Sequence, residues 1–219
     1  MNFSSLPPKL DDCLIHGSGT GAELFIVEGD SASNAVSRIR KVQFQAVLPM
    51  QGKPLNALKA TQKKVAGYVL FQALSDALGA GWGLEFEAPK LRFDRILLLM
   101  DADADGIHCG ALMLMYFYRW MRPLLSDGKI EMVRAPLAEI HADGQPGPLY
   151  VYSEDHYRRL SVELKQQGAR NITARRYRGL AGIDAEILAT TCVNPATRKT
   201  QPMGIADAEA AIAFFGGGV

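Results

Sequence analysis

The sequence predicts an α/β fold built on a mostly parallel, doubly wound sheet, and three observations support this prediction. Apolar runs near 23–28, 45–50, 96–100 and 129–134 have the length of strands, and the third contains no polar residue. Such a run is typical of a strand buried on both faces. Segments with helical spacing of apolar residues separate these runs. Strands and helices that alternate in this way form parallel sheets with helices on both faces.

The connecting segments predict helices that begin at turn residues and end at glycines. Asp30 or Ser31 is expected to cap the first helix, because short polar side chains accept hydrogen bonds from free backbone N–H groups. The expected helices span 31–41, 62–78, 106–125, 155–167 and 207–215, and a further short strand spans 149–152.

Composition indicates a globular chain without a strong charge bias. Of its 219 residues, 48% are hydrophobic, which is enough for one domain with a buried core plus a small appendage. The 24 lysines and arginines are balanced by 23 acids. This balance excludes the strongly basic class of nucleic-acid-binding proteins, so any contact with DNA has to come from local basic patches.

Cysteine usage and hydropathy fit a protein of the reducing cytoplasm. Cys13, Cys109 and Cys192 are scattered and form no C-x-x-C pair, which supports neither a zinc site nor a disulfide framework. The first residues lack the basic and apolar regions of a signal peptide. The most apolar stretch, 107–125, is interrupted by two arginines and a proline, which argues against a membrane span.

Breaker residues divide the chain into three predicted parts. Residues 1–20 carry a Pro-Pro pair and several glycines and are expected to be a loose leader. The glycines and prolines of 141–148 form the clearest boundary. We therefore predict a leader at 1–20, an α/β domain at 21–145 and a tail at 146–219 that forms a small α+β appendage.

Three acids follow the third apolar run at alternate positions and precede a glycine: Asp101, Asp103 and Asp105, then Gly106. In an extended chain, Asp101 and Asp103 lie on the same side, roughly 7 Å apart, and a turn would bring Asp105 beside them. Clustered carboxylates raise one another's pKa unless a cation lies between them. Hard oxygen ligands of this kind suit Mg²⁺. The pattern therefore predicts a divalent-metal site at the carboxyl end of a strand.

A fourth acid, Glu28, ends the first apolar run. The carboxyl ends of parallel strands lie at the same edge of a sheet, where ligands of α/β proteins gather. If the first and third runs are neighbouring strands, Glu28 faces Asp101 and Asp103 across about 5 Å. Four carboxylates in that arrangement suit phosphoryl transfer, in which metal ions neutralise charge on the reacting phosphate.

These acids and several further motifs follow the order and spacing of a known family. Glu28-Gly29 with Asp101, Asp103 and Asp105 resembles the Toprim domain shared by topoisomerases, bacterial primases and some nucleases. Nearly the whole chain, from 9 to 214, resembles the B subunits of bacterial type IIA topoisomerases. The motifs are Glu28-Gly-Asp-Ser-Ala32, Leu48-Pro49, Gly52-Lys53, Leu55-Asn56, Asp101 to His108, Phe117-Tyr-Arg119, Arg176-Tyr-Arg-Gly-Leu180, Thr190-Thr191, Asn194-Pro195 and Thr197-Arg198.

The resemblance implies a Toprim-type sheet and the Mg²⁺-dependent DNA cleavage and religation half-site of a type II topoisomerase. It implies that Glu28, Asp101 and Asp103 bind Mg²⁺, with Asp105 assisting. Glu28 is also expected to act as the general acid/base at the 3′ oxygen. The attack on the DNA phosphate would come from a tyrosine on a separate A-type subunit.

The resemblance also implies the partners of the chain. Lys53, Arg176 and Arg178 are expected to contact the backbone of double-stranded DNA. The ATPase region that precedes this segment in the family is absent from the sequence, so we expect no ATP site here and ATP hydrolysis on a separate subunit or domain. The expected location is the cytoplasm, in association with the nucleoid.

The sequence departs from the family pattern at several positions, and two other functions stay open. Gln51 replaces a basic residue, Ser33 and Asn34 replace glycines, and Gly182 replaces a glutamate. A non-catalytic Toprim-like module that binds DNA or topoisomerase subunits fits these departures. The third possibility is an esterase of the Gly-Asp-Ser type.

That esterase would use Ser31 with Asp105 and His108 as a catalytic triad. The chain has no Gly-x-Asn-Asp stretch for an oxyanion hole, and this function would leave Glu28 and Asp103 without a role. We therefore rank it last.

Overall fold

The computed structural model describes residues 6–216 and confirms the predicted α/β class. Its main sheet contains β2 (Gln45–Met50), β1 (Glu23–Glu28), β3 (Arg95–Leu99), β4 (Ile130–Val133) and β8 (Thr200–Pro202), in that order. Strands β1 to β4 run parallel, and β8 pairs with β4 in the antiparallel direction. The four apolar runs of the sequence therefore form the four parallel strands.

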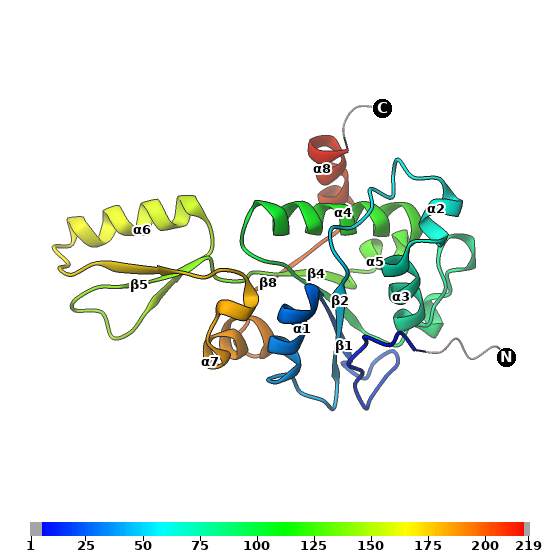
Figure 1. Cartoon of the computed structure of the whole chain (residues 1–219), viewed down its shortest axis with the longest axis horizontal. Helices are drawn as coiled ribbons and strands as arrows, with labels where there is room; N and C mark the ends of the chain where they lie inside the picture. The colour runs from blue at the N-terminus through cyan, green and yellow to red at the C-terminus, as the bar shows by residue number, and fades with distance from the viewer. Residues whose placement is uncertain (1–5, 217–219) are drawn as a thin grey trace.

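Helices cover both faces of this sheet, as a doubly wound fold requires (Figure 1). One face packs against α3 (Val69–Leu78), α4 (Ala104–Trp120), α5 (Arg122–Ser126) and α8 (Ile205–Phe215). The opposite face packs against α1 (Gly29–Ser37) and α7 (Ala185–Leu188). Among the described residues, no helix combines the length and apolar character needed to cross a bilayer.

Side chains of successive residues in each strand point alternately into the two hydrophobic cores. In β1, Leu24 and Ile26 enter the core under α3 and α4, whereas Phe25 and Val27 enter the core under α1. All four side chains are fully buried. This two-sided burial explains why the strands appear in the sequence as continuous apolar runs rather than alternating ones.

Three helix predictions need correction. The segment 62–78 is divided into α2 (Gln62–Ala66) and α3 at Gly67, because glycine is a poor helix former. The long helix ends at Trp120 and resumes as α5, since Pro123 offers no N–H and its ring would collide with the carbonyl four residues earlier. Helix α1 starts at Gly29 without a side-chain cap and ends at Ser37, so neither Asp30 nor Ser31 caps it.

The described part of the predicted leader, residues 6–20, is not loose. Asp11 exchanges two backbone hydrogen bonds of 2.9 Å with Val47, on the outer side of β2. Cys13 is buried, and Asp12 accepts a hydrogen bond from Arg92 Nη2 at 2.5 Å. The segment therefore covers the β2 edge of the sheet; the prediction for residues 1–5 lies outside the described residues.

A second, antiparallel sheet follows β4 and extends to one side of the main sheet (Figure 1). It contains β6 (Leu149–Val151), β5 (Ala138–His141) and β7 (Thr173–Arg176), and α6 (Glu154–Gln166) packs against it. This sheet begins at Ala138, before the predicted boundary at 145, and β8 and α8 then return to the main sheet. The division of the chain into domains stays a prediction.

The remaining elements are single turns. They are 3₁₀ turns at Gly83–Glu85, Ala88–Lys90 and Leu180–Gly182, and a π-helical turn at Ala189–Val193.

A buried polar network joins the tail to the start of the main sheet. Arg198 donates to both carboxylate oxygens of Glu23, at 2.7 and 2.5 Å, and the two side chains are only 1% and 3% exposed. Arg95 donates to Glu23 at 3.0 Å and binds Glu131 through two bonds of 2.6 Å. Buried charges are tolerated only when they are paired and hydrogen-bonded, so the network fixes where the tail crosses the sheet.

Removing one partner of this network should destabilise the protein strongly. We expect Arg198→Ala to lower the free energy of unfolding by about 3–5 kcal/mol, because Glu23 would keep a buried charge without its main partner. The matched control is Arg158→Ala on α6, an exposed arginine 3.8 Å from Asp155, which should change stability by less than about 0.5 kcal/mol. Urea unfolding followed by circular dichroism measures both, and equal midpoints for the two variants would contradict a structural role for Arg198.

Candidate metal centre

Parallel pairing of β1 and β3 brings the two acidic strand ends together. Val27 lies opposite Leu99, so Glu28 and the residues after Leu99 meet at the carboxyl edge of the sheet. Glu28 Oε1 accepts a hydrogen bond from the backbone N–H of Asp101 at 3.2 Å. The two chain segments that carry the acids are therefore in direct contact.

Three of the four acids are held in the same way, with one oxygen bonded to a backbone N–H. Glu28 uses Oε1, as described; Asp101 Oδ1 accepts from Leu180 N at 2.8 Å, and Asp103 Oδ1 accepts from Gly106 N at 2.8 Å. The bond of Asp103 caps the N-terminus of α4. Within residues 6–216, the second oxygen of each carboxylate has no hydrogen bond. Each side chain is thus oriented and keeps one oxygen for a ligand.

The electrostatics of the cluster favour a cation. Burial raises the pKa of Glu28, and the charges of Asp101, Asp103 and Asp105 raise it further, against the opposing effect of the Asp101 N–H. Burial also raises the pKa of Asp101, with a further contribution from Asp103 and an opposing one from the Leu180 N–H. Both groups resist ionisation first because they are partly buried and further because neighbouring carboxylates repel them, and a divalent cation would offset both effects.

Two glycines allow the backbone to approach these acids closely. A Cβ at Gly106 would lie 2.1 Å from the carbonyl oxygen of Asp101 and 2.8 Å from Glu28 Oε1. A Cβ at Gly179, whose φ is +74°, would lie 2.9 Å from Asp101 Oδ2. Gly179 and Leu180 are therefore part of the site, although the sequence alone assigned them no role in it. Their place in the Arg176–Leu180 motif was the available signal.

The fourth acid occupies a more open position. Asp105 lies in the first turn of α4 with its side chain 82% exposed, and Lys53 Nζ donates to its Oδ1 at 3.0 Å. Lys53 was predicted to contact DNA, and the structure places it beside the acidic cluster, where it neutralises Asp105. The amide nitrogen of Gln51 donates to Asp30 Oδ1 at 3.4 Å.

The two predicted DNA-binding arginines differ in their surroundings. Arg176, on β7, pairs with Glu154 through two hydrogen bonds, one of them 2.8 Å long. Arg178 is exposed and has no side-chain partner within the described part of the chain, and it directly precedes Gly179, which abuts Asp101. Of the two, Arg178 is the one that is near the acids and available to a phosphate.

The carboxylates of Glu28, Asp101 and Asp103 suit Mg²⁺ better than they suit a metal that is coordinated by several protein ligands at once. Among residues 6–216, the only His, Cys, Asp or Glu ligand atoms that form a group of three within 4.8 Å are those of Asp12, Cys13 and His16. The carboxylate cluster is wider than that. Mg²⁺ takes one or two carboxylates and fills its shell with water and phosphate oxygens, so Glu28, Asp101 and Asp103 provide a suitable donor set.

The compact group at Asp12 already contains a cation. Arg92 Nη2 donates to Asp12 Oδ2 at 2.5 Å and lies 2.8 Å from His16 Nε2. The Cys13 thiol donates to the carbonyl of Ile15, and burial raises its pKa. The Arg92 guanidinium thus occupies the position that a metal ion would need. The cluster of Asp12, Cys13 and His16 serves instead to attach residues 6–20 to the sheet.

The esterase interpretation finds no geometric support. Ser31 lies in α1, and the His108 ring stacks on Phe215, with ring centroids 5.1 Å apart. No hydrogen bond joins Ser31, His108 and Asp105 among the described residues. A Ser-His-Asp triad requires those contacts.

Comparison with known proteins agrees with this geometry. Residues 23–135 match the Toprim domain family, and this segment contains β1 to β4 and all four acids. This chain belongs to the Toprim family. The predicted resemblance is thereby confirmed.

Relatives extend the likeness beyond the Toprim segment. The B subunit of DNA gyrase from Thermotoga maritima is 41% identical over 213 residues, or 97% of this chain and 32% of the relative. Its counterpart from Spiroplasma citri is 39% identical over 198 residues, 90% of this chain and 30% of the relative. The one from Archaeoglobus fulgidus is 36% identical over 213 residues, covering 97% and 32%. The chain spans about a third of the length of these curated relatives.

The burial of Glu28 and the negative charges around it predict a distinctive pH dependence of stability in the absence of divalent ions. A carboxyl whose pKa is raised on folding binds its proton more tightly in the folded state than in the unfolded state. It therefore lowers stability as pH rises from its ordinary value, 4.5 for Glu28, through its raised value. We expect Glu28→Gln to gain stability relative to wild type between pH 4 and pH 7 in EDTA.

The control for this measurement is Asp30→Asn. The ion pair with Lys9 lowers the pKa of Asp30, so the wild-type residue stabilises the fold above its ordinary value of 3.8. The Asp30 variant should therefore be less stable than wild type by a nearly constant amount over the same pH range. Thermal unfolding at several pH values gives both trends, and a pH-independent difference for Glu28→Gln would contradict the electrostatic description of the site.

Proposed function

We propose that this Toprim chain supplies the Mg²⁺-binding carboxylates of the DNA cleavage and religation site of a type II topoisomerase. The observation that supports it most is the set of three acids at one sheet edge, each oriented by a backbone N–H and each with one oxygen left for a ligand. The similarity to the B subunit of DNA gyrase gives this chemistry its context.

Mg²⁺ at this edge would neutralise charge on the DNA phosphate and polarise the leaving 3′ oxygen. Asp101 and Asp103 would hold the ion. Glu28 would hold it as well and exchange a proton with the 3′ oxygen, a role for which a pKa raised by burial is suited, because a general acid works best when its pKa approaches the working pH. Asp105 would assist while bound to Lys53.

The chain would act together with other polypeptide segments. The nucleophile in this scheme is a tyrosine of an A-type subunit, and ATP hydrolysis belongs to a separate subunit or domain. Double-stranded DNA is the substrate, and the chain would work on it in the cytoplasm at the nucleoid. Arg178 would contact the DNA backbone next to the metal site, with Lys53 and Arg176 as further contacts.

A second candidate function is a non-catalytic Toprim module that binds DNA or topoisomerase subunits. Two observations favour it: Gln51 carries no charge where the family has a basic residue, and Lys53 is engaged by Asp105. Both features weaken the attraction for DNA near the acids. A measurement of Mg²⁺-dependent DNA cleavage distinguishes the two functions, because only the catalytic one requires it.

Replacing Asp101 should abolish cleavage without unfolding the chain. We expect Asp101→Asn to eliminate Mg²⁺ binding at low millimolar concentrations, as measured by calorimetry. It should also remove Mg²⁺-dependent cleavage of supercoiled plasmid in a mixture with a tyrosine-bearing A-type subunit and an ATPase domain. Asp76→Asn on α3 is the control and should leave both unchanged. Wild-type protein that binds Mg²⁺ but never supports cleavage would favour the non-catalytic module.

The two tail arginines should contribute unequally to DNA binding. We expect Arg178→Ala to lower the slope of log affinity against log salt by about 0.9, the value for one phosphate contact on duplex DNA. Arg176→Ala should lower it less, because Glu154 already neutralises Arg176. Fluorescence anisotropy with a duplex oligonucleotide at several salt concentrations measures both slopes. An unaltered slope for Arg178→Ala would remove this arginine from the interface.

A further inference from the structure

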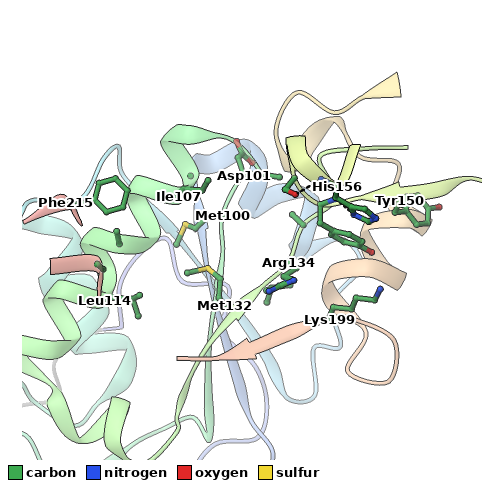
Figure 2. Close-up of a pocket in the computed structure, with 18 of the residues that line it drawn as sticks. Met100, Asp101, Ile107, Leu114, Met132, Arg134, Tyr150, His156, Lys199 and Phe215 are labelled. Carbon is green, nitrogen blue, oxygen red and sulfur yellow. Dashed lines mark hydrogen bonds between the residues drawn. The ribbon is translucent and has the colours of Figure 1, made fainter. Parts of the chain in front are cut away.

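A cleft of about 800 Å³ opens next to the acidic cluster, between the main sheet and the second sheet. Its walls come from the ends of β3 and β4, from α4 and α8, and from β6 and α6 on the opposite side (Figure 2). Asp101 lines its rim, so the cleft is continuous with the candidate metal centre. A cavity of this size is in the range of pockets for small organic ligands, about 300–1,000 Å³, and too small for a DNA duplex.

The wall of the cleft nearest α4 and α8 is apolar. Figure 2 shows the side chains of Met100, Met132, Leu114 and Phe215 grouped on this side. Ile107, which also lines the cleft, leaves 62% of its surface exposed. This wall offers a surface on which a flat, weakly polar group can lie.

The opposite wall is basic and aromatic. Arg134 and Lys199 lie at its base, and the backbone N–H of Arg134 donates to the carbonyl of Lys199 at 3.0 Å. Pairing of β4 with β8 thus sets two cations side by side, an arrangement that costs stability. Neither has an ion pair within 4.0 Å among the described residues, and Arg134 bonds only the neutral amide of Gln201.

A third cation and the side chains of Tyr150 and Tyr152 complete this wall. Arg159 enters from α6 and has no ion pair with any described residue, whereas its neighbour Arg158 pairs with Asp155. The ammonium of Lys199 lies 5.2 Å from the centre of the Tyr152 ring. Asp101 is the one acid among the described residues that line the cleft. The carboxylates of the described residues therefore leave most of this positive charge unneutralised, and an anionic ligand would neutralise it.

We propose that the cleft binds one or two unpaired nucleotides of a DNA strand, next to the phosphate held at the acidic cluster. The phosphates contact Arg134, Lys199 and Arg159, and the base or sugar lies on the wall of Met132 and Phe215. Basic grooves with stacking surfaces bind single-stranded DNA in this manner. The inference rests on the proposed function, which places a DNA phosphate at Asp101, and adds a subsite that orients one strand beyond it.

The test compares two hairpin DNA probes in EDTA, so that it does not depend on catalysis. Both probes carry fluorescein. One has a blunt end, and the other has a four-nucleotide single-stranded overhang, which is made once as a 5′ overhang and once as a 3′ overhang. Fluorescence anisotropy with the full chain should show tighter binding of an overhang probe than of the blunt probe. Equal affinity for blunt and overhang probes of both polarities would overturn the proposal.

Substitutions in the cleft should remove this preference. We expect Arg134→Gln with Lys199→Gln to weaken overhang binding about tenfold, and to lower the salt slope by about 1.4, or 0.7 for each single-strand phosphate contact. Arg159→Gln, on the same basic wall, should lower the slope by about 0.7. Arg158→Gln is the matched control, because this arginine lies outside the cleft, and it should bind as wild type does. Circular dichroism verifies that each variant is folded.

Competition identifies the ligand class, and the metal-site variant separates this proposal from the proposed function. Displacement of the overhang probe by thymidine monophosphate or by polyglutamate as effectively as by an unlabelled strand would overturn the strand assignment. Asp101→Asn should keep its overhang preference in EDTA even though cleavage is lost. If cleavage by wild-type protein fails while the preference persists, only the proposed function falls. If cleavage occurs and the cleft variants bind normally, only the cleft assignment falls.

Discussion

The buried contact between Glu23 and Arg198 is the constraint on which the rest of the structure depends. It joins residues 175 positions apart, at the opposite end of β1 from the acidic cluster. With Arg198 fixed, β8 pairs with β4, and the preceding tail segment passes the carboxyl edge of the sheet. Leu180 can then donate its N–H to Asp101. A site composed of Toprim acids is thus completed by the tail.

The same geometry explains how a crowded acidic cluster is compatible with a stable fold. Each of the three acids gives one oxygen to a backbone N–H, which compensates part of the cost of burying a carboxylate. Gly106 and Gly179 make these bonds possible, because any larger residue would collide with Asp101 or Glu28. Rigid placement of the acids is what a metal-dependent reaction needs, and the three backbone N–H groups provide it here.

Much of this arrangement could be predicted from the sequence, for identifiable reasons. The strands β1 to β4 bury both faces and therefore appear as apolar runs, and Glu28 and Asp101 stand at their ends. Strands β7 and β8 of the tail have no such signal, although the short strand β6 (Leu149–Val151) was predicted. All residues of β7 (Thr173–Arg176) are exposed, and β8 is three residues long and ends in a proline. Their positions depend on pairing with distant strands, and so does the contact between Leu180 and Asp101, which local sequence patterns do not encode.

The two border strands of the main sheet, β2 and β8, offer few free backbone groups to another strand. On the β2 side, the backbone of Asp11 forms hydrogen bonds with the outward N–H and C=O of Val47, and Pro49 in the same strand has no N–H. On the other side, β8 is short and contains Pro202, which likewise has no N–H to offer. Neither border can readily accept a strand from a neighbouring polypeptide. Addition of a further strand to the main sheet is therefore disfavoured at both borders, so contacts that this sheet makes with another polypeptide have to use its side chains.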